Sequence, residues 1–257
     1  MSGDLKVTIA GLDFFGQGMH DFVIEPDGFS GWDDGVDMRV EDTARPQRHG
    51  SLDLPVYQGS RTVSLSGQSF AANNAKLRCN RNRLAGLLAG GGSGRIQVDR
   101  DGDVQWADCK LAARTKFTER GGQDMADYQI QVWCPDGRKY GRTWEYTASV
   151  GAPASGVRHY GNFEATPMFE VTGNAPSGYT ITIKGLVFNV VYPLIPGQTH
   201  SINYDDGDLV INGVAVPGAI GYGFTPKVTP GVPTALAVVA PGGGSATVKL
   251  TLRDTFI

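Results

Sequence analysis

The stretch RTVSLSG, residues 61–67, alternates apolar and polar side chains with a period of two. Val63 and Leu65 share one face of an extended chain, and the hydroxyl side chains around them share the other. This pattern predicts a β-strand with one buried and one solvated face. The same alternation recurs in YQIQVW (128–133), YTITIK (179–184) and ATVKLTL (246–252). Because strands with one wet face are typical of antiparallel sheets, the sequence predicts a mainly β protein.

Asp-Gly pairs interrupt the alternating stretches and predict tight turns that close hairpins. Three segments carry them: DRDGDV (99–104), CPDGRK (134–139) and YDDGDL (204–209).

One segment departs from the period of two. NNAKLRCNRNRLAGLLAG, residues 73–90, predicts a single helix over about 74–89, with Asn73 or Asn74 as its N-cap and a run of glycines from Gly90 as its end. Leucines at helical spacing form a stripe that we expect to pack on a sheet, namely Leu77, Leu84 and Leu88.

The opposite side of this helix is a narrow face of small side chains. A face of this kind lets another backbone approach closely, so it predicts either a docking face for a neighbouring subunit or a plain solvent-facing stripe. Its residues are Ala75, Cys79, Asn82 and Gly86.

Overall composition restricts the class of protein. A net charge of −3 gives no general attraction to nucleic acid or to an anionic membrane. The start of the chain lacks the basic and apolar regions of a signal peptide, and no apolar run approaches the roughly 18–20 residues of a membrane span. We therefore expect a protein that is made and folded in the cytoplasm, with reduced thiols and no membrane partner.

The three cysteines, Cys79, Cys109 and Cys134, are an odd number without CxxC spacing. This argues against a disulfide framework and against a structural zinc site. Small buried apolar side chains are the ordinary interpretation of all three.

Charge is distributed unevenly along the chain. Residues 1–150 hold most of the 23 Lys+Arg and 26 Asp+Glu, and a Pro/Gly/Ser-type linker, SVGAPASG (149–156), lies where the composition changes. The sequence thus predicts two domains: a β-rich domain with one helix over 1–150, and an all-β sandwich over 151–257.

Two neighbouring stretches raise the question of function. RPQRHGS (45–51) contains two arginines, a histidine and a serine, and it follows the acidic run GWDDGVDMRVED (31–42). An active site, an anion or nucleic-acid site, and a loop that locks one subunit to another are the three interpretations. Catalysis is disfavoured, because His49 and Ser51 have no GxSxG elbow or oxyanion loop beside them. The aspartates lack the spacing of a calcium loop, so we expect no metal and no cofactor.

A basic segment, residues 76–100, provides a possible counterpart. It carries Lys76, Arg78, Arg81, Arg83, Arg95 and Arg100 against Asp99 alone. Such an excess could bind phosphate, but no nucleic-acid-binding motif accompanies it. A charged interface rim, met by the acidic 33–42 run of a neighbour, explains it equally well.

Carbohydrate binding is another possibility, because sugar sites stack aromatic faces on sugar rings. The second domain as predicted has no Trp, but other aromatic side chains are available there: Tyr179, Tyr192, Tyr204, Tyr222 and Phe224.

Taken in order, four segments resemble the distal tail protein family of long, non-contractile-tailed phages (the siphophage Dit family). They are GWDDGVDMRVEDTARPQRHGSLDLPVYQGSRTVSLSGQ (31–68), GNFEATPMFEVTG (161–173), SINYDDGDLVINGV (201–214) and TPGVPTALAVVAPGGGSATVKLTLRDTFI (229–257). Their order and spacing carry the resemblance, since no single motif is as specific as a metal signature.

The resemblance implies an N-terminal β-sandwich with one helix and an extended hairpin, and a C-terminal galectin-like β-sandwich. It further implies a non-catalytic structural protein of the phage tail tip or baseplate. Six copies would close into a ring between the tail tube protein and the tail-associated hub or fibre protein. DNA would pass through this ring without being read in a sequence-specific way. A carbohydrate-binding tail module for host adsorption is the alternative, and an enzyme is a distant third.

A closed ring needs two complementary surfaces on each subunit. Trp32 is the candidate anchor because Trp is enriched at interface hot spots, with a plug in the local core as the other interpretation. The full set of candidate interface residues is Trp32, Asp33, Asp34, Arg39, Arg45, Arg48, His49, Arg78, Cys79, Arg81 and Arg83.

Overall fold

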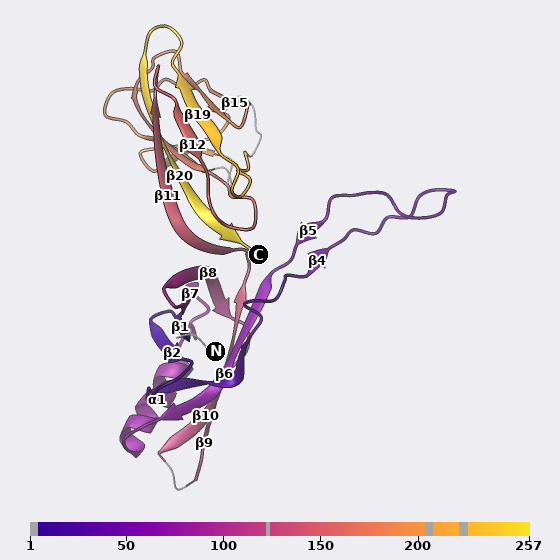
Figure 1. Cartoon of the computed structure of the whole chain (residues 1–257), viewed down its shortest axis with the longest axis vertical. Helices are drawn as coiled ribbons and strands as arrows, with labels where there is room; N and C mark the ends of the chain where they lie inside the picture. The colour runs from indigo at the N-terminus through magenta and orange to yellow at the C-terminus, as the bar shows by residue number, and fades with distance from the viewer. Residues whose placement is uncertain (1–4, 122–123, 204–207, 221–225) are drawn as a thin grey trace. The chain divides into compact units, whose positions relative to one another are not determined.

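The computed structural model describes residues 5–121, 124–203, 208–220 and 226–257. Over these ranges the chain is mainly β-structure with one α-helix, so the predicted mainly β class with a single helix is confirmed. The chain divides into two compact units (Figure 1). The first ends at Lys139 and also includes Ile257, and the second runs from Tyr140 to Phe256.

The boundary between the units differs from the predicted one at residue 150. Strand β11 (Lys139–Ser149) neighbours strand β20 (Ser245–Phe256) in the second unit. A Glu145–Lys249 ion pair of 2.8 Å joins these two strands. The composition change at residue 150 therefore follows the end of β11 and does not mark where the second unit begins.

Apart from a separate two-stranded ribbon, the strands of the first unit form one sheet that closes on itself. Its order is β8-β7-β1-β2-β3-β6-β10-β9, and β10 also pairs with β8, which closes the sheet around a core. The strands are β1 (Leu5–Ile9), β2 (Leu12–Phe15), β3 (Phe22–Ser30), β6 (Arg61–Phe70), β7 (Gly94–Arg100), β8 (Asp103–Leu111), β9 (Lys116–Glu119) and β10 (Met125–Cys134).

The stretch RTVSLSG lies in β6 and behaves as its alternation predicts. β6 pairs with β10 in antiparallel register, placing Val63 opposite Val132 and Leu65 opposite Ile130. All four side chains are fully buried, whereas Thr62 is exposed. Burying an aliphatic side chain of this size contributes about 1.5–3 kcal/mol, so this pair of strands is a main source of stability for the first unit.

Helix α1 (Asn74–Gly86) begins at the N-cap Asn73, whose side-chain oxygen accepts a hydrogen bond from the Lys76 N–H at 2.9 Å. It ends at Gly86 rather than near residue 89, because Leu87 has an extended backbone and Leu88 has a φ of 55°. Among the described residues, α1 does not have the length and apolar character that a membrane-crossing helix needs.

The helix packs on the sheet through Leu77 and Leu84, which are buried as predicted. Leu88 is only half-buried beyond the helix end, and Leu87 is buried instead. The stripe also contains a buried polar residue, Asn80, whose Nδ2 lies 3.2 Å from the Ser69 Oγ. Two of the three predicted leucines therefore attach the helix, together with a polar contact that the apolar pattern does not reveal.

The Asp-Gly segments have three different outcomes. DRDGDV closes the β7–β8 hairpin, with Asp101 and Gly102 both at positive φ, as a two-residue turn of this type requires. CPDGRK closes no hairpin, because β10 and β11 are not neighbours in the described sheets, so that prediction is wrong. The predicted turn within YDDGDL lies outside the described residues, although the strands on either side of it, β16 (His200–Asn203) and β17 (Asp208–Ile211), pair antiparallel.

The second unit contains two sheets. Their orders are β18-β17-β16-β13-β20-β11 and β12-β19-β14-β15. The remaining strands are β12 (Ala154–Val157), β13 (Met168–Asn174), β14 (Tyr179–Ile183), β15 (Leu186–Val190), β18 (Val214–Val216) and β19 (Thr234–Val239).

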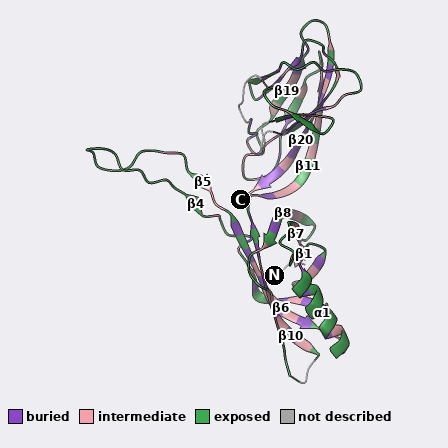
Figure 2. Ribbon diagram, turned by 180° about the vertical axis from the view of Figure 1, so that it is seen from behind, coloured by how far each residue is buried: buried purple, intermediate pink, exposed green. Residues whose placement is uncertain are grey.

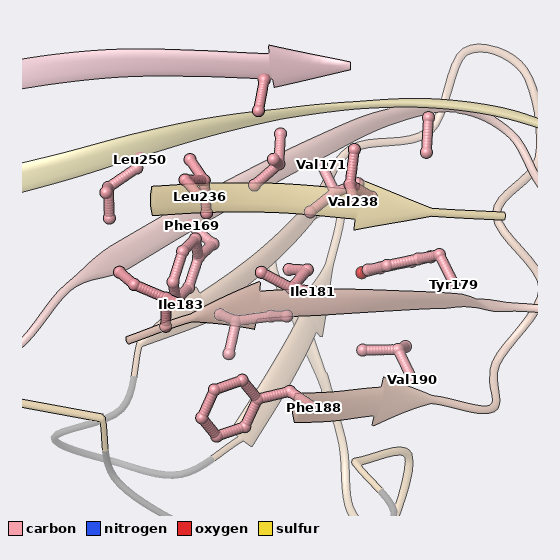
Figure 3. Close-up of a cluster of buried hydrophobic side chains, with 14 of the residues drawn as sticks. Phe169, Val171, Tyr179, Ile181, Ile183, Phe188, Val190, Leu236, Val238 and Leu250 are labelled. Atoms are coloured by element: carbon pink, nitrogen blue, oxygen red, sulfur yellow. The ribbon is translucent and has the colours of Figure 1, made fainter. Parts of the chain in front are cut away.

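Side chains of both sheets meet in one core, which makes the second unit a sandwich (Figure 3). Phe169 and Leu250 come from the larger sheet, and Ile181 and Phe188 come from the smaller one. The predicted inward faces of YTITIK and ATVKLTL are buried at every apolar alternate position: Tyr179, Ile181, Ile183, Val248, Leu250 and Leu252.

A buried histidine makes the stability of the second unit dependent on pH. His200 is fully buried, its Nδ1 lies 3.1 Å from the Tyr179 hydroxyl, and burial lowers its pKa. The unfolded chain therefore binds a proton at this histidine more readily than the folded chain does, beginning near the ordinary pKa of about 6.5. We expect stability to be complete above pH 6.5 and to fall below it, by up to about 1.4 kcal/mol per pH unit.

Thermal unfolding between pH 5 and pH 8 measures this dependence. His200→Phe should flatten the acid limb, whereas the exposed His49→Gln should leave it unchanged. An identical acid limb in His200→Phe and the wild-type chain would show that another group causes the loss.

Candidate subunit interface

A long, exposed hairpin, residues 37–58, extends from the first unit and is here called the arm (Figure 1). At its base β4 (Met38–Arg39) pairs with β5 (Tyr57–Gln58). Farther out, Ala44 forms an antiparallel bridge with Ser51. The two strands of the arm therefore have each other as backbone partners.

The arm has no core of its own. Between residues 38 and 57 every residue except Leu54 is exposed (Figure 2, green). Its apolar side chains are between 45% and 64% exposed, and they are Met38, Val40, Leu52, Val56 and Tyr57. Because an isolated two-stranded hairpin is marginal in water and exposed apolar groups mark interaction sites, the arm has the character of a segment that binds another surface.

RPQRHGS forms the tip of the arm. The Arg45 N–H donates to the Gly50 carbonyl at 3.0 Å, which closes the turn. Gln47 and Gly50 both have positive φ. Arg48 and His49 are exposed there, so the tip presents polar and cationic groups to any partner.

The tip does not form a catalytic pair. The Ser51 hydroxyl donates to the Asp42 carboxylate and not to His49. A pocket of about 360 Å³ elsewhere in the first unit, lined in part by Asp13, His20 and Asp21, is likewise an arrangement of ion pairs and stacked rings. In the ranges that the structure describes, no three His, Cys, Asp or Glu side chains gather as a metal ion would require.

The base of the arm is held by a buried arginine, Arg61, at the start of β6. Its Nη1 donates to the carbonyls of Gly31, Trp32 and Asp34 at 2.7–2.9 Å, and its Nε donates to the Gly137 carbonyl at 3.2 Å. Arg61 is 3% exposed, and burial lowers its pKa. One side chain thus joins the loop before the arm, the strand after it and the segment between β10 and β11.

Trp32 lies in this buried cluster, which corrects its predicted role as an interface anchor. It is 2% exposed and belongs to the core of the first unit. The Lys139 ammonium donates to its carbonyl at 3.0 Å and lies 5.7 Å from its ring centre. A side chain enclosed in this way is the local core plug and is not available to a neighbouring subunit.

The acidic run and the basic segment are partly paired within one chain. Arg100 forms a bidentate pair with Asp33, with N–O distances of 2.8 and 2.5 Å, and these hydrogen bonds lower the pKa of the Asp33 carboxyl. The Asp34 carboxylate accepts a hydrogen bond from the Gly31 N–H at 3.0 Å. Of the candidate acids, these two are therefore engaged at the base of the arm.

Most of the remaining basic segment is paired as well. Lys76 and Arg83 both bind Asp21, at 2.8 and 2.9 Å. Further pairs are Arg81–Glu119 at 3.3 Å and Arg95–Asp108 at 3.4 Å. Of the six cations in residues 76–100, only Arg78 has no ion-pair partner in the described part of the chain. This segment is thus a poor counterpart for a neighbour's acidic run.

The small face of α1 is open to solvent, with Ala75, Cys79, Asn82 and Gly86 all exposed. It remains a candidate contact for a neighbour. The expectation that all three cysteines are buried is wrong for Cys79, which is exposed. Cys109 and Cys134 are buried. Burial raises the pKa of Cys109 to about 11 and that of Cys134 to about 12, so both stay protonated thiols.

The aromatic candidates for sugar binding are not gathered on one surface. Tyr179 is buried in the core, and Tyr192 is 41% exposed. Tyr204, Tyr222 and Phe224 lie outside the described residues. Trp144, on β11, belongs to the second unit, which therefore does contain a tryptophan.

Sequence reasoning missed two features of this interface. The apolar side chains of the arm were not singled out, although DMRVED (37–42) and LDLPVY (52–57) alternate like any strand. Arg61 was also missed, because its acceptors Gly31 and Gly137 are far from it in sequence.

No protein-family model matches the sequence, and neither does any curated protein. Among solved structures, the chain is similar to the crystal structure of the SPP1 Dit (gp 19.1) protein, described as a paradigm of the hub adsorption apparatus in phages that infect Gram-positive bacteria. The TM-score is 0.71 at 15% identity, over 98% of this chain and 99% of that one.

Two structures of the phage P2 baseplate in its activated conformation, with Ca and with Sr, align over 97% and 96% of this chain and 98% of each of theirs. Their TM-scores are 0.45 and 0.44 at 10% identity. At these identities the likeness to SPP1 Dit establishes the fold, which this chain shares nearly from end to end.

Proposed function

We propose that the chain is a distal tail protein: a structural, non-catalytic hub protein of the tail tip or baseplate of a long, non-contractile-tailed phage. The observation that carries the proposal is the exposed apolar arm on a chain with the fold of SPP1 Dit over nearly its whole length. The likeness supports a hub role, and the arm supports assembly through contacts between copies.

In this proposal six copies form a closed ring. Each arm binds the next copy, so that every subunit gives one surface and receives another, as a head-to-tail interface requires. The ring joins the tail tube protein on one side to the tail-associated hub or fibre protein on the other. Burying the apolar side chains of six arms would supply the free energy of closure.

DNA would pass through the centre of this ring without sequence-specific contacts. A net charge of −3 suits such a passage, because a strongly basic channel would retain the phosphate backbone. The chain would be made in the host cytoplasm and incorporated into the virion.

Immunogold labelling tests this location. Antibodies against the purified chain should label particles of the phage that encodes it at the end of the tail farthest from the head. Gold on the capsid, or no gold on intact and detergent-opened tails, would contradict the proposal.

The tip of the arm provides a milder test of assembly. Arg45→Ala with Arg48→Ala should weaken ring formation at moderate salt while leaving the monomer folded, because both side chains are exposed and surface changes are usually within ±0.5 kcal/mol. Sedimentation velocity over a dilution series measures the change. A dissociation curve equal to that of the wild-type chain would remove the tip from the interface.

A carbohydrate-binding module is the second candidate function. Trp144 lies beside Tyr160 in the second unit, with ring centres 5.1 Å apart. However, an arginine covers one face of each ring and the two rings lie against each other, so less of either ring is open to a stacking sugar. This geometry makes the carbohydrate role the weaker of the two.

A further inference from the structure

Four side chains of the second unit form a row in which two adjacent aromatic rings have a guanidinium group at each end. The Arg142 guanidinium lies 4.2 Å from the Trp144 ring centre, and the Arg158 guanidinium lies 5.2 Å from the Tyr160 ring centre. The two rings are themselves 5.1 Å apart and tilted by 52°. We call these four residues the ladder.

Hydrogen bonds to the rest of the unit fix the ladder in place. One carboxylate oxygen of the buried Asp254 accepts from the Trp144 indole at 2.9 Å and from the Tyr160 N–H at 2.6 Å. The Tyr146 hydroxyl donates to the Arg158 carbonyl at 2.7 Å. The rings and the backbone beneath the arginines are therefore held before any partner arrives.

The outer ends of the ladder are open and positively charged. Arg142 and Arg158 are exposed, and Tyr160 is 51% exposed. Over the described ranges no carboxylate lies within ion-pair distance of either guanidinium. A guanidinium that lies over a ring keeps its N–H edge free for bidentate binding of a carboxylate.

The arm carries the complementary charge. Outside its tip, the acidic residues are Asp37, Glu41, Asp42 and Asp53, against the single cation Arg39, which lies over Tyr57. Asp42 accepts a hydrogen bond from Ser51, whereas Glu41 and Asp53 have no ion-pair partner among the residues with described positions. These two carboxylates lie on opposite strands of the arm.

We propose that the ladder is the surface that receives the arm of a second copy, with Arg142 and Arg158 binding carboxylates such as Glu41 and Asp53. This inference rests on the proposed assembly of copies and names its acceptor surface. It replaces the basic segment 76–100 in that role, since five of the six cations there already have partners in their own chain.

Two other exposed cations of the chain are less suited to this role. Arg114 and Lys116 are exposed, but no aromatic ring holds either of them in the described structure. A free side chain loses about 0.5–1.5 kcal/mol on being immobilised in an interface, and a guanidinium already held over a ring loses less. Trp, Tyr and Arg are also the side chains most enriched among interface hot spots.

A charge swap in the full-length chain tests the proposal. The ladder variant is Arg142→Glu with Arg158→Glu, and the arm variant is Glu41→Lys with Asp53→Lys. Each alone places like charges opposite each other and should weaken assembly about 100-fold, since such juxtapositions cost several kcal/mol. A chain with all four substitutions should regain most of this loss, because opposite charges meet again.

Arg114→Glu with Lys116→Glu is the matched control, with the same change in net charge and both groups exposed. Sedimentation velocity gives the assembly constant of each chain, and thermal unfolding verifies that each one folds. A ladder variant that assembles like the control would overturn the proposal, and so would a four-substitution chain that regains nothing. A wild-type chain that never assembles would instead refute the proposed function, so the two failures are distinguishable.

Discussion

A chain with its arm shortened is expected to lose assembly altogether while both units stay folded. Residues 39–57 are replaced by Asn-Gly, which closes a two-residue turn where Met38 lies opposite Gln58. The arm is exposed and adds nothing to either core, so the unfolding midpoint should not fall. Light scattering should then report a monomer at concentrations where the wild-type chain is assembled.

A variant with an arm of full length distinguishes the effect of the apolar side chains of the arm from the effect of shortening it. Val40→Ser, Leu52→Ser and Val56→Ser should also prevent assembly, because burying these side chains is the proposed driving force. The matched control is Val187→Ser with Val239→Ser, two valines of the second unit that are similarly exposed, at 52% and 55%. Equal loss in both variants would show that surface polarity in general, and not the arm, controls assembly.

Arg61→Met is expected to destabilise the first unit by at least about 3 kcal/mol. Methionine keeps part of the apolar stem but removes the donor to the carbonyls of Gly31, Asp34 and Gly137, and each buried acceptor left without a partner costs about 1–3 kcal/mol. Urea unfolding followed by tryptophan fluorescence measures the loss, since Trp32 contacts the site. The stability of Arg61→Lys should lie between that of the wild-type chain and that of Arg61→Met, because one ammonium group can replace only some of the hydrogen bonds of the guanidinium.

Arg120→Met is the control for a change of arginine to methionine. Arg120 forms a bidentate pair with Asp127 on the surface, at 3.1 and 2.8 Å. Exposed ion pairs contribute little, so its unfolding midpoint should stay within error of the wild-type value. If Arg61→Met also left the midpoint unchanged, water would be bonding to the carbonyls that lost Arg61, and the base of the arm would not depend on this side chain.

The local features of the fold could be read from the sequence because local physics determines them. Alternation placed Val63 and Leu65 in a core, and the N-cap is Asn73, one of the two asparagines predicted for that position. The Asp101-Gly102 turn followed from the need for two residues at positive φ. In each case the deciding interactions lie within a few residues of one another.

The misinterpreted residues depend on contacts that are distant in sequence. Trp32 lies in a Gly- and Asp-rich stretch typical of an exposed loop, yet Arg61 and Lys139 enclose it. The charge runs were expected to meet across subunits, but Arg100 reaches Asp33 within the chain. Charge patterns alone cannot distinguish a pair within one chain from a pair between chains.

The arm shows a second limit of prediction from the sequence. Met38 and Val40 alternate with polar residues as Val63 and Leu65 do, but the first two are exposed and the second two are buried. Alternation predicts that a strand has an apolar face without identifying the surface that covers it. Only the fold shows that, in the described part of this chain, these arm side chains are left exposed.

The mass of the purified chain, measured by light scattering behind a sizing column with negative-stain images of the peak, tests the central claim most directly. Six copies of the 27.4 kDa chain give roughly 164 kDa. The account predicts a species of that mass that appears as a ring with a central hole. A 27.4 kDa monomer at every concentration, with no ring on the grids even after the tail tube protein is added, would contradict it.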